Sequence, residues 1–162
     1  MRSLAPILLI AVLAACGPSA LINVHTTAEG VARAILDAVA RKDWETLRVL
    51  AVTEQEFRVH IWPSLPAARP ERNLPFSYIW GDLRQKSETS LASMLAARGG
   101  QRYDLVSVAF GKSPTDYAGF RIHREPLLTV RTSAGSVEEL RLTGSFLQKD
   151  GVWKVFSYLA DD

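Results

Sequence analysis

Apolar residues in the first half of the chain recur at helical spacing. One stripe consists of Val31, Ile35, Leu36 and Val39, which lie one, three or four residues apart. The segment Thr26-Thr27-Ala28-Glu29 precedes this stripe and places a hydroxyl and a carboxylate three residues apart, the spacing of a capping box. The pattern therefore predicts a long amphipathic helix that ends near Arg41.

Two shorter helices are expected next, each with its own start signal. Asp43 is typical of an N-cap and opens a helix that carries Leu47 on its apolar face. Thr53-Glu54-Gln55-Glu56 is a second capping box, and the helix behind it should end at Pro63.

Prolines dominate residues 63–75. Their density, with four prolines at Pro63, Pro66, Pro70 and Pro75, predicts an extended and conformationally stiff loop without regular elements. From Phe76 a long helical stretch is expected to run to Arg98, where Gly99-Gly100 stops it.

The second half of the chain alternates with a period of two and predicts strands. These strands are expected over residues 103–110, 117–131, 137–149 and 152–159. Pro126 indicates a bulge or an edge position, and Asp150-Gly151 is a tight hairpin signal between the last two strands.

Helices followed by an antiparallel meander predict an α+β fold. The N-terminal helices should pack on a curved four-stranded antiparallel sheet. The residues expected in the core are Val31, Ile35, Val39, Leu47, Phe57, Leu142, Phe146, Trp153 and Val155.

Two short patterns stand out within this order of elements. They are Ala38-Val39-Ala40-Arg41-Lys42-Asp43-Trp44-Glu45-Thr46-Leu47 and the closing Asp150-Gly151-Val152-Trp153-Lys154-Val155. With the order of elements across roughly residues 27–160, they resemble the cone-shaped, cystatin-like fold of the nuclear-transport-factor-two-like superfamily. The resemblance implies a hydrophobic cavity between helices and sheet. Enzymatic relatives, such as ketosteroid isomerases and polyketide cyclases, place an Asp, His or Tyr there as acid, base or oxyanion donor.

The N-terminus has the features of an export signal. Arg2 supplies a positive charge, and the apolar run from Leu4 to Leu13 is too short to span a bilayer. The segment Leu13-Ala14-Ala15-Cys16 resembles the lipobox of a bacterial lipoprotein. The resemblance implies diacylglycerol on Cys16 and cleavage just before it, and two or more acyl chains give stable anchoring to a membrane.

This interpretation divides the chain into three parts. Residues 1–15 form the signal peptide, residues 16–25 the lipidated cysteine and tether, and residues 26–162 a single α+β domain. We expect an exported protein, lipid-anchored to the cell envelope. An Asp just after the lipidated cysteine would resemble an inner-membrane retention signal, but this position holds Gly17. The resemblance therefore favours the outer membrane, facing the periplasm, if the source has two membranes.

The composition excludes several classes of protein and several kinds of site. The 162 residues include 19 Lys and Arg against 17 Asp and Glu, a balance that argues against a nucleic-acid binder. The single cysteine excludes an internal disulfide and a Cys-rich metal site. The three histidines lack metal-ligand spacing, and no phosphate loop or nucleophile elbow is present, so no cofactor is expected.

Four ionisable residues are candidates for a catalytic group in the cavity, and the pattern assigns none of them a catalytic role. The helical pattern turns Asp37 toward water, Asp104 alternates with apolar neighbours, and His60 lies one turn from Phe57. His123 lies between Arg121 and Glu125 along the face of a strand, which indicates a solvated ladder of polar side chains.

The proline loop and its flanks form the other candidate site. Aromatic residues bracket the loop and two arginines lie within it, a combination typical of partner-binding anchors: Trp62, Arg69, Arg72, Tyr78 and Trp80. The alternative is that both tryptophans are core residues that hold an otherwise loose loop in place. The loop is expected to be ordered, with both arginines exposed.

Two function classes stay open at this point. The first is a non-catalytic envelope lipoprotein whose domain binds a small apolar ligand or another envelope protein. The second is an isomerase- or cyclase-type enzyme that acts on a small hydrophobic substrate in the cone cavity. A polar dyad in the cavity would indicate the enzyme, whereas an apolar or filled cavity favours binding or scaffolding, and we favour the first class.

Overall fold

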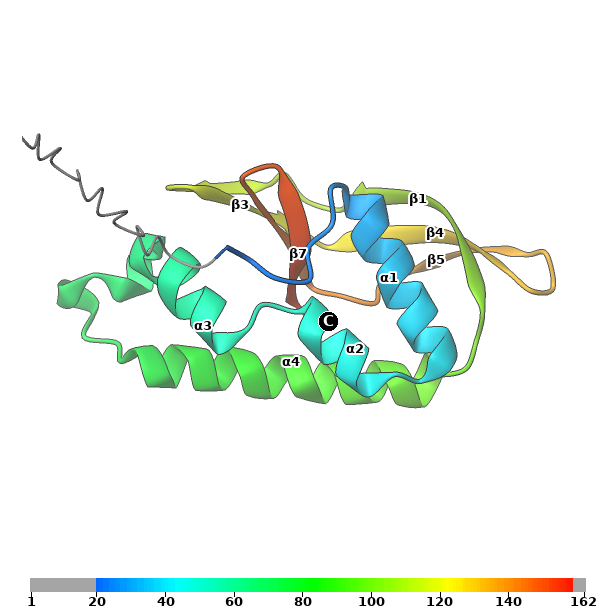
Figure 1. Cartoon of the computed structure of the whole chain (residues 1–162), viewed down its shortest axis with the longest axis horizontal. Helices are drawn as coiled ribbons and strands as arrows, with labels where there is room; N and C mark the ends of the chain where they lie inside the picture. Colours follow the sequence, from blue (N-terminus) through cyan, green and yellow to red (C-terminus); the bar gives the residue numbers. More distant parts are fainter. Residues whose placement is uncertain (1–19, 159–162) are drawn as a thin grey trace, which may run out of the picture.

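The computed structural model describes residues 20–158, and helices precede strands throughout it (Figure 1). The fold is therefore α+β, as the sequence predicts. The helical half contains α1 (Ala28–Arg41), α2 (Trp44–Leu50), α3 (Glu54–Glu56), the π-helical turn η1 (Phe57–Ile61), the 3₁₀ turns η2 (Trp62–Ser64), η3 (Pro66–Ala68) and η4 (Pro70–Arg72), and α4 (Phe76–Arg98).

The helix starts follow the predicted capping signals closely. Thr27, one residue later than the predicted box suggests, accepts a hydrogen bond from the Gly30 amide and caps α1. Asp43 caps α2 through the Thr46 amide at 2.9 Å. The capping box at α3 is complete, because the side chain of each end residue accepts a hydrogen bond from the backbone amide of the other.

The proline loop differs from the expectation of an extended segment. Residues 62–72 instead form three consecutive 3₁₀ turns, η2, η3 and η4, each with a proline at its first or second position. The dihedral that proline imposes suits the first turn of a helix, where its missing N–H costs no hydrogen bond. The prolines therefore shape the loop into short turns rather than extending it.

The strands form two antiparallel sheets, which corrects the prediction of one curved four-stranded sheet. The first sheet has the order β1-β4-β5 and the second the order β2-β3-β6-β7. The strands are β1 (Tyr103–Phe110), β2 (Thr115–Tyr117), β3 (Phe120–Arg124), β4 (Pro126–Thr132), β5 (Val137–Leu140), β6 (Ser145–Lys149) and β7 (Val152–Ser157).

Glu125 is where one predicted strand becomes two. Its backbone has a φ of 52°, in the left-handed region, and Pro126 follows, so β3 ends and β4 starts in a new direction. The Glu125 carbonyl accepts from the Gly111 amide at 3.0 Å, and its own amide donates to the Gly144 carbonyl at 2.9 Å. The two sheets meet at this corner. The predicted strand over residues 137–149 is likewise divided, into β5 and β6.

The hairpin between β6 and β7 forms as predicted. Asp150 and Gly151 have φ values of 50° and 79°, the pair of positive values that a type I′ turn requires.

Two apolar clusters form the interior. The first lies between α1 and the strands, and Val31, Ile35, Val39 and Phe146 have no exposed surface there. The second joins Phe57 and Ile61 of η1 to residues of β3 and β6. Every residue predicted for the core is buried, except that Trp153 is half-buried at the edge of the first cluster. Among residues 20–158, no helix combines the length and apolar character needed to cross a membrane.

Candidate functional site

A cleft of about 280 Å³ opens between the end of α2, the middle of α4 and strand β7. Its walls are mostly apolar, and its charged groups lie on the surrounding helices. The lining residues are Arg48, Val49, Ala51, Val52, Thr53, Glu54, Trp80, Leu83, Arg84, Ser87, Glu88, Leu91, Phe156 and Tyr158. The volume is just below the usual range of ligand pockets, about 300–1,000 Å³, and suits a small molecule or inserted side chains.

The hydroxyl and the backbone amide of Tyr158 in the cleft wall both have hydrogen-bond partners. Its hydroxyl donates to the Leu47 carbonyl at 2.6 Å, and its backbone amide donates to Ser87 Oγ at 2.9 Å. Burial raises the pKa of Tyr158 above its ordinary value. A neutral phenol held by a backbone carbonyl is an element of structure, and it is poorly placed to serve as a proton donor to a ligand.

The charges of the cleft lining balance. Two arginines and two glutamates contribute, and Arg84 lies 3.9 Å from Glu88 within the lining. Arg48 pairs with Glu45 at 3.0 Å, so neither arginine offers a strong field for an anion. This arrangement favours an uncharged, apolar occupant.

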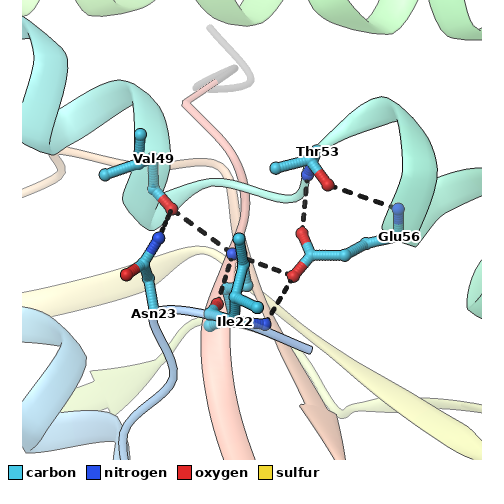
Figure 2. A network of polar contacts seen from close by, with 6 residues as sticks. Ile22, Asn23, Val49, Thr53 and Glu56 are labelled. Carbon is cyan, nitrogen blue, oxygen red and sulfur yellow. Dashed lines mark hydrogen bonds and ion pairs between the residues drawn. The ribbon is translucent and has the colours of Figure 1, made fainter. Parts of the chain in front are cut away.

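A buried ion pair lies next to the cleft, where β7 meets the helices. Lys154 has no exposed surface, and its Nζ lies 3.2 Å from Oε1 of Glu56, which is 5% exposed. The same ammonium donates to the carbonyls of Ile22 at 2.6 Å and Val49 at 3.3 Å. Figure 2 shows how Glu56 faces Ile22 on one side and Thr53 on the other.

This network, which we call the clamp, consists of Ile22, Val49, Thr53, Glu56 and Lys154. Burial raises the pKa of Glu56, but the Thr53 and Ile22 amides and the Lys154 ammonium outweigh it, so the pKa lies below its ordinary value. Burial also lowers the pKa of Lys154, and the Glu56 carboxylate opposes that shift.

The clamp was missed by the reading of the sequence. The alternating pattern places Trp153 and Val155 on the buried face of the strand and predicts that Lys154, on the other face, is exposed to solvent. In the structure, helices and the N-terminal segment cover that other face. The Thr53–Glu56 capping box was recognisable, but its second role was not. One carboxylate oxygen of Glu56 accepts a hydrogen bond from the Thr53 amide, and the other accepts from the Ile22 amide and the Lys154 ammonium.

The four ionisable candidates lie on four different elements, α1, η1, β1 and β3. Asp37 is exposed, as predicted, and Asp104 is exposed too. His60 is half-buried on η1. The prediction for His123 was wrong: it is 9% exposed and its ring lies 4.9 Å from Phe110, because β1 and β7 cover that face of β3.

The His123 ring has further partners in this enclosed position. Its centroid is 4.4 Å from that of Trp153, and Nε2 lies 2.8 Å from Gln148 Oε1. In the part of the chain that the structure describes, no group of three or more His, Cys, Asp or Glu side chains is arranged to hold a metal ion.

The aromatic candidates around the proline loop separate into different roles. Trp62 is half-buried and packs against Phe76 with ring centroids 5.6 Å apart, which makes it a core residue of the second cluster. Trp80 lies 5.3 Å from Phe57 and also lines the cleft. Tyr78 is 66% exposed.

Arg69 and Arg72 are exposed on the loop, as predicted. The proposed lipidation residue, Cys16, lies outside the described residues. No family model, curated protein or solved structure matches this chain.

Proposed function

We propose that this chain is an envelope lipoprotein, anchored through lipid on Cys16, whose domain binds a small apolar ligand or an apolar group of another envelope protein. The observation that carries the binding role is the cleft between α2, α4 and β7, with its apolar walls and balanced charges. The lipobox-like segment and its cysteine, the only one in the chain, support the anchor.

We also propose kinship with the nuclear-transport-factor-two-like superfamily. The order of a long helix, shorter helices and antiparallel strands supports it. The space between α1 and the strands, where that resemblance would place a ligand pocket, contains fully buried side chains such as Ile35, Val39 and Phe146. The cleft on the far side of β7 is therefore the better ligand site, and the engaged Tyr158 hydroxyl favours binding over the enzymatic alternative.

Fatty-acid labelling tests the anchor. The parent chain should incorporate labelled palmitate in a bacterial host with lipoprotein-processing enzymes, and Cys16→Ser should incorporate none and leave the membrane fraction. A Cys16→Ser variant that labels and fractionates like the parent would disprove the anchor without bearing on the cleft.

A matched pair of tryptophan substitutions on α4 tests the cleft. Leu83 faces the cleft and Ala96 is exposed further along the same helix. Leu83→Trp should fill the space and weaken binding of the neutral dye phenylnaphthylamine at least about tenfold, roughly 1.4 kcal/mol. Ala96→Trp should leave dye binding unchanged. Equal binding by both variants, with melting temperatures like the parent's, would show that the dye site lies elsewhere.

A further inference from the structure

The chain just after the proposed lipid anchor is fixed to the folded domain. The backbone amide of Ile22 donates to Glu56 Oε1 at 2.8 Å, and its carbonyl accepts from Lys154 Nζ at 2.6 Å. His25 exchanges two backbone hydrogen bonds with Trp153, at 2.9 and 2.7 Å, as an added strand would. From Ile22 onward the chain therefore moves with the domain.

The clamp leaves only a short link to Cys16. Whatever conformation the intervening residues take, six residue steps reach at most about 20 Å. Helix α4, with 23 residues, is by comparison about 35 Å long. A lipid on Cys16 would therefore hold the part of the domain around Ile22 within about 20 Å of the membrane.

The proline loop lies on the same side of the domain as Leu21. Leu21 packs in the second apolar cluster together with Trp62 and Leu65 of the loop region. Figure 1 shows the first described residues on the side of α3 and β3, whereas the turn between β4 and β5 extends at the opposite side. The short link therefore brings the loop, and not the β4–β5 turn, toward the lipid.

The side chains exposed on the loop suit a phospholipid surface. Within the described residues, neither Arg69 nor Arg72 has an ion-pair partner, and guanidinium groups bind phosphate through paired hydrogen bonds. Leu74, which follows η4, is 38% exposed, and Tyr78, on the first turn of α4, is 66% exposed. Tyrosine is enriched at the level of lipid headgroups because it combines an apolar ring with a polar end.

We propose that the proline loop, through Arg69, Arg72 and Leu74, together with Tyr78 on the first turn of α4, rests on the headgroups of anionic phospholipids and fixes the orientation of the domain on the membrane. The inference rests on the proposed function, since it requires the lipid on Cys16. It adds the partner surface and the orientation. Glu71 between the two arginines leaves the loop with a small positive charge, so the contact should strengthen with anionic lipid.

Site-specific labels on the lipidated full-length chain test this orientation. Because Cys16 is the only cysteine and would carry lipid, an introduced cysteine is a unique thiol for a fluorophore. Leu74→Cys places the label on the loop, and Ser133→Cys places it at the β4–β5 turn. Each protein is reconstituted into vesicles of phosphatidylglycerol and phosphatidylcholine, at one to three, that carry a nitroxide quencher at the headgroup.

The loop label should be quenched strongly and the Ser133→Cys label weakly. Adding Arg69→Ala and Arg72→Ala should reduce the quenching of the loop label toward that of the Ser133→Cys label. Each cation near an anionic surface contributes a factor of about five in binding. Loss of two arginines should therefore reduce the preference for the orientation with the loop on the membrane roughly thirtyfold. Arg102→Ala with Arg131→Ala removes the same charge at the opposite end and should change nothing.

Each other outcome counts against the proposal. Equal quenching at both positions, or quenching that the Arg69→Ala, Arg72→Ala pair leaves unchanged, would overturn the lipid contact while the anchor stands. A loop position that crosslinks to another protein in cells, while its label is unquenched on vesicles, would show that the loop binds a protein partner instead of lipid. Absence of fatty acid on Cys16, measured first by palmitate labelling, would remove the anchor and this orientation together.

Discussion

Replacing Lys154 by Met tests the clamp most directly. Methionine fills a similar volume but removes the ammonium, so Glu56 loses its charge partner and the Ile22 and Val49 carbonyls lose their donor. Glu56 keeps two amide hydrogen bonds, from Thr53 at 2.8 Å and Ile22 at 2.8 Å. The variant therefore leaves a buried carboxylate that is still hydrogen-bonded but no longer neutralised.

The structure sets the size of the effect. Removing one partner of a buried ion pair costs about 3–5 kcal/mol, and Lys154 and Glu56 are 0% and 5% exposed. Domains of this size unfold with about 5–15 kcal/mol, so Lys154→Met should consume a large part of the stability. Lys86→Met, at an exposed lysine paired with Asp82 at 2.9 Å, is the matched control and should change little.

Urea unfolding at neutral pH measures both variants. Combining Lys154→Met with Glu56→Leu should cost less than the sum of the two single variants, because an apolar pair leaves no uncompensated charge. A loss below about 1 kcal/mol for Lys154→Met, or strict additivity in the double variant, would refute the burial and pairing described above.

The clamp also predicts how stability depends on pH. Because the pKa of Glu56 lies below its ordinary value of 4.5, the stability that it contributes is present above pH 4.5 and is lost as the pH falls through the folded-state pKa. Glu56→Gln should therefore weaken the acid dependence of unfolding. An unchanged slope below pH 4.5 would show that other carboxylates account for it.

Three further substitutions test other parts of the structure. Tyr158→Phe removes the hydrogen bond to the Leu47 carbonyl and should cost about 1–2 kcal/mol in urea unfolding. Because burial raises the pKa of Tyr158, the stability that its neutral hydroxyl contributes is complete below pH 10 and is lost as the pH rises through the folded-state pKa. The variant should therefore also show a smaller loss of stability at alkaline pH. Gly151→Ala should cost about 1 kcal/mol, because φ is 79° there. Trp153→Ala should cost about 2–4 kcal/mol, less than the loss of a fully buried tryptophan. A loss below about 0.5 kcal/mol would show that the ring contacts of Trp153 with Phe110 and His123 contribute nothing to stability.

Local signals in the sequence predicted the local structure well. The caps at Asp43 and Thr53, the stripe of α1 and the Asp150-Gly151 turn each depend on residues within a few positions of one another, and all appear in the structure. The division into two sheets did not follow, because Pro126 indicated only a bulge or an edge position within one strand and not the end of that strand. The chain turns at the left-handed backbone of Glu125, which is hydrogen-bonded to Gly111 just after β1 and to Gly144 just before β6.

Strand β7 explains why the site itself was harder to predict. Alternation identifies one buried face and assumes that the other meets water, which is right for a sheet covered on one side. Here α2, α3 and the segment around Ile22 cover the second face, so Lys154 is fully buried and its charge requires Glu56. A lysine in a strand gives no sign of such a partner 98 residues away. The burial of Lys154 is a consequence of docking the N-terminal segment, and that same docking shortens the link to the proposed anchor.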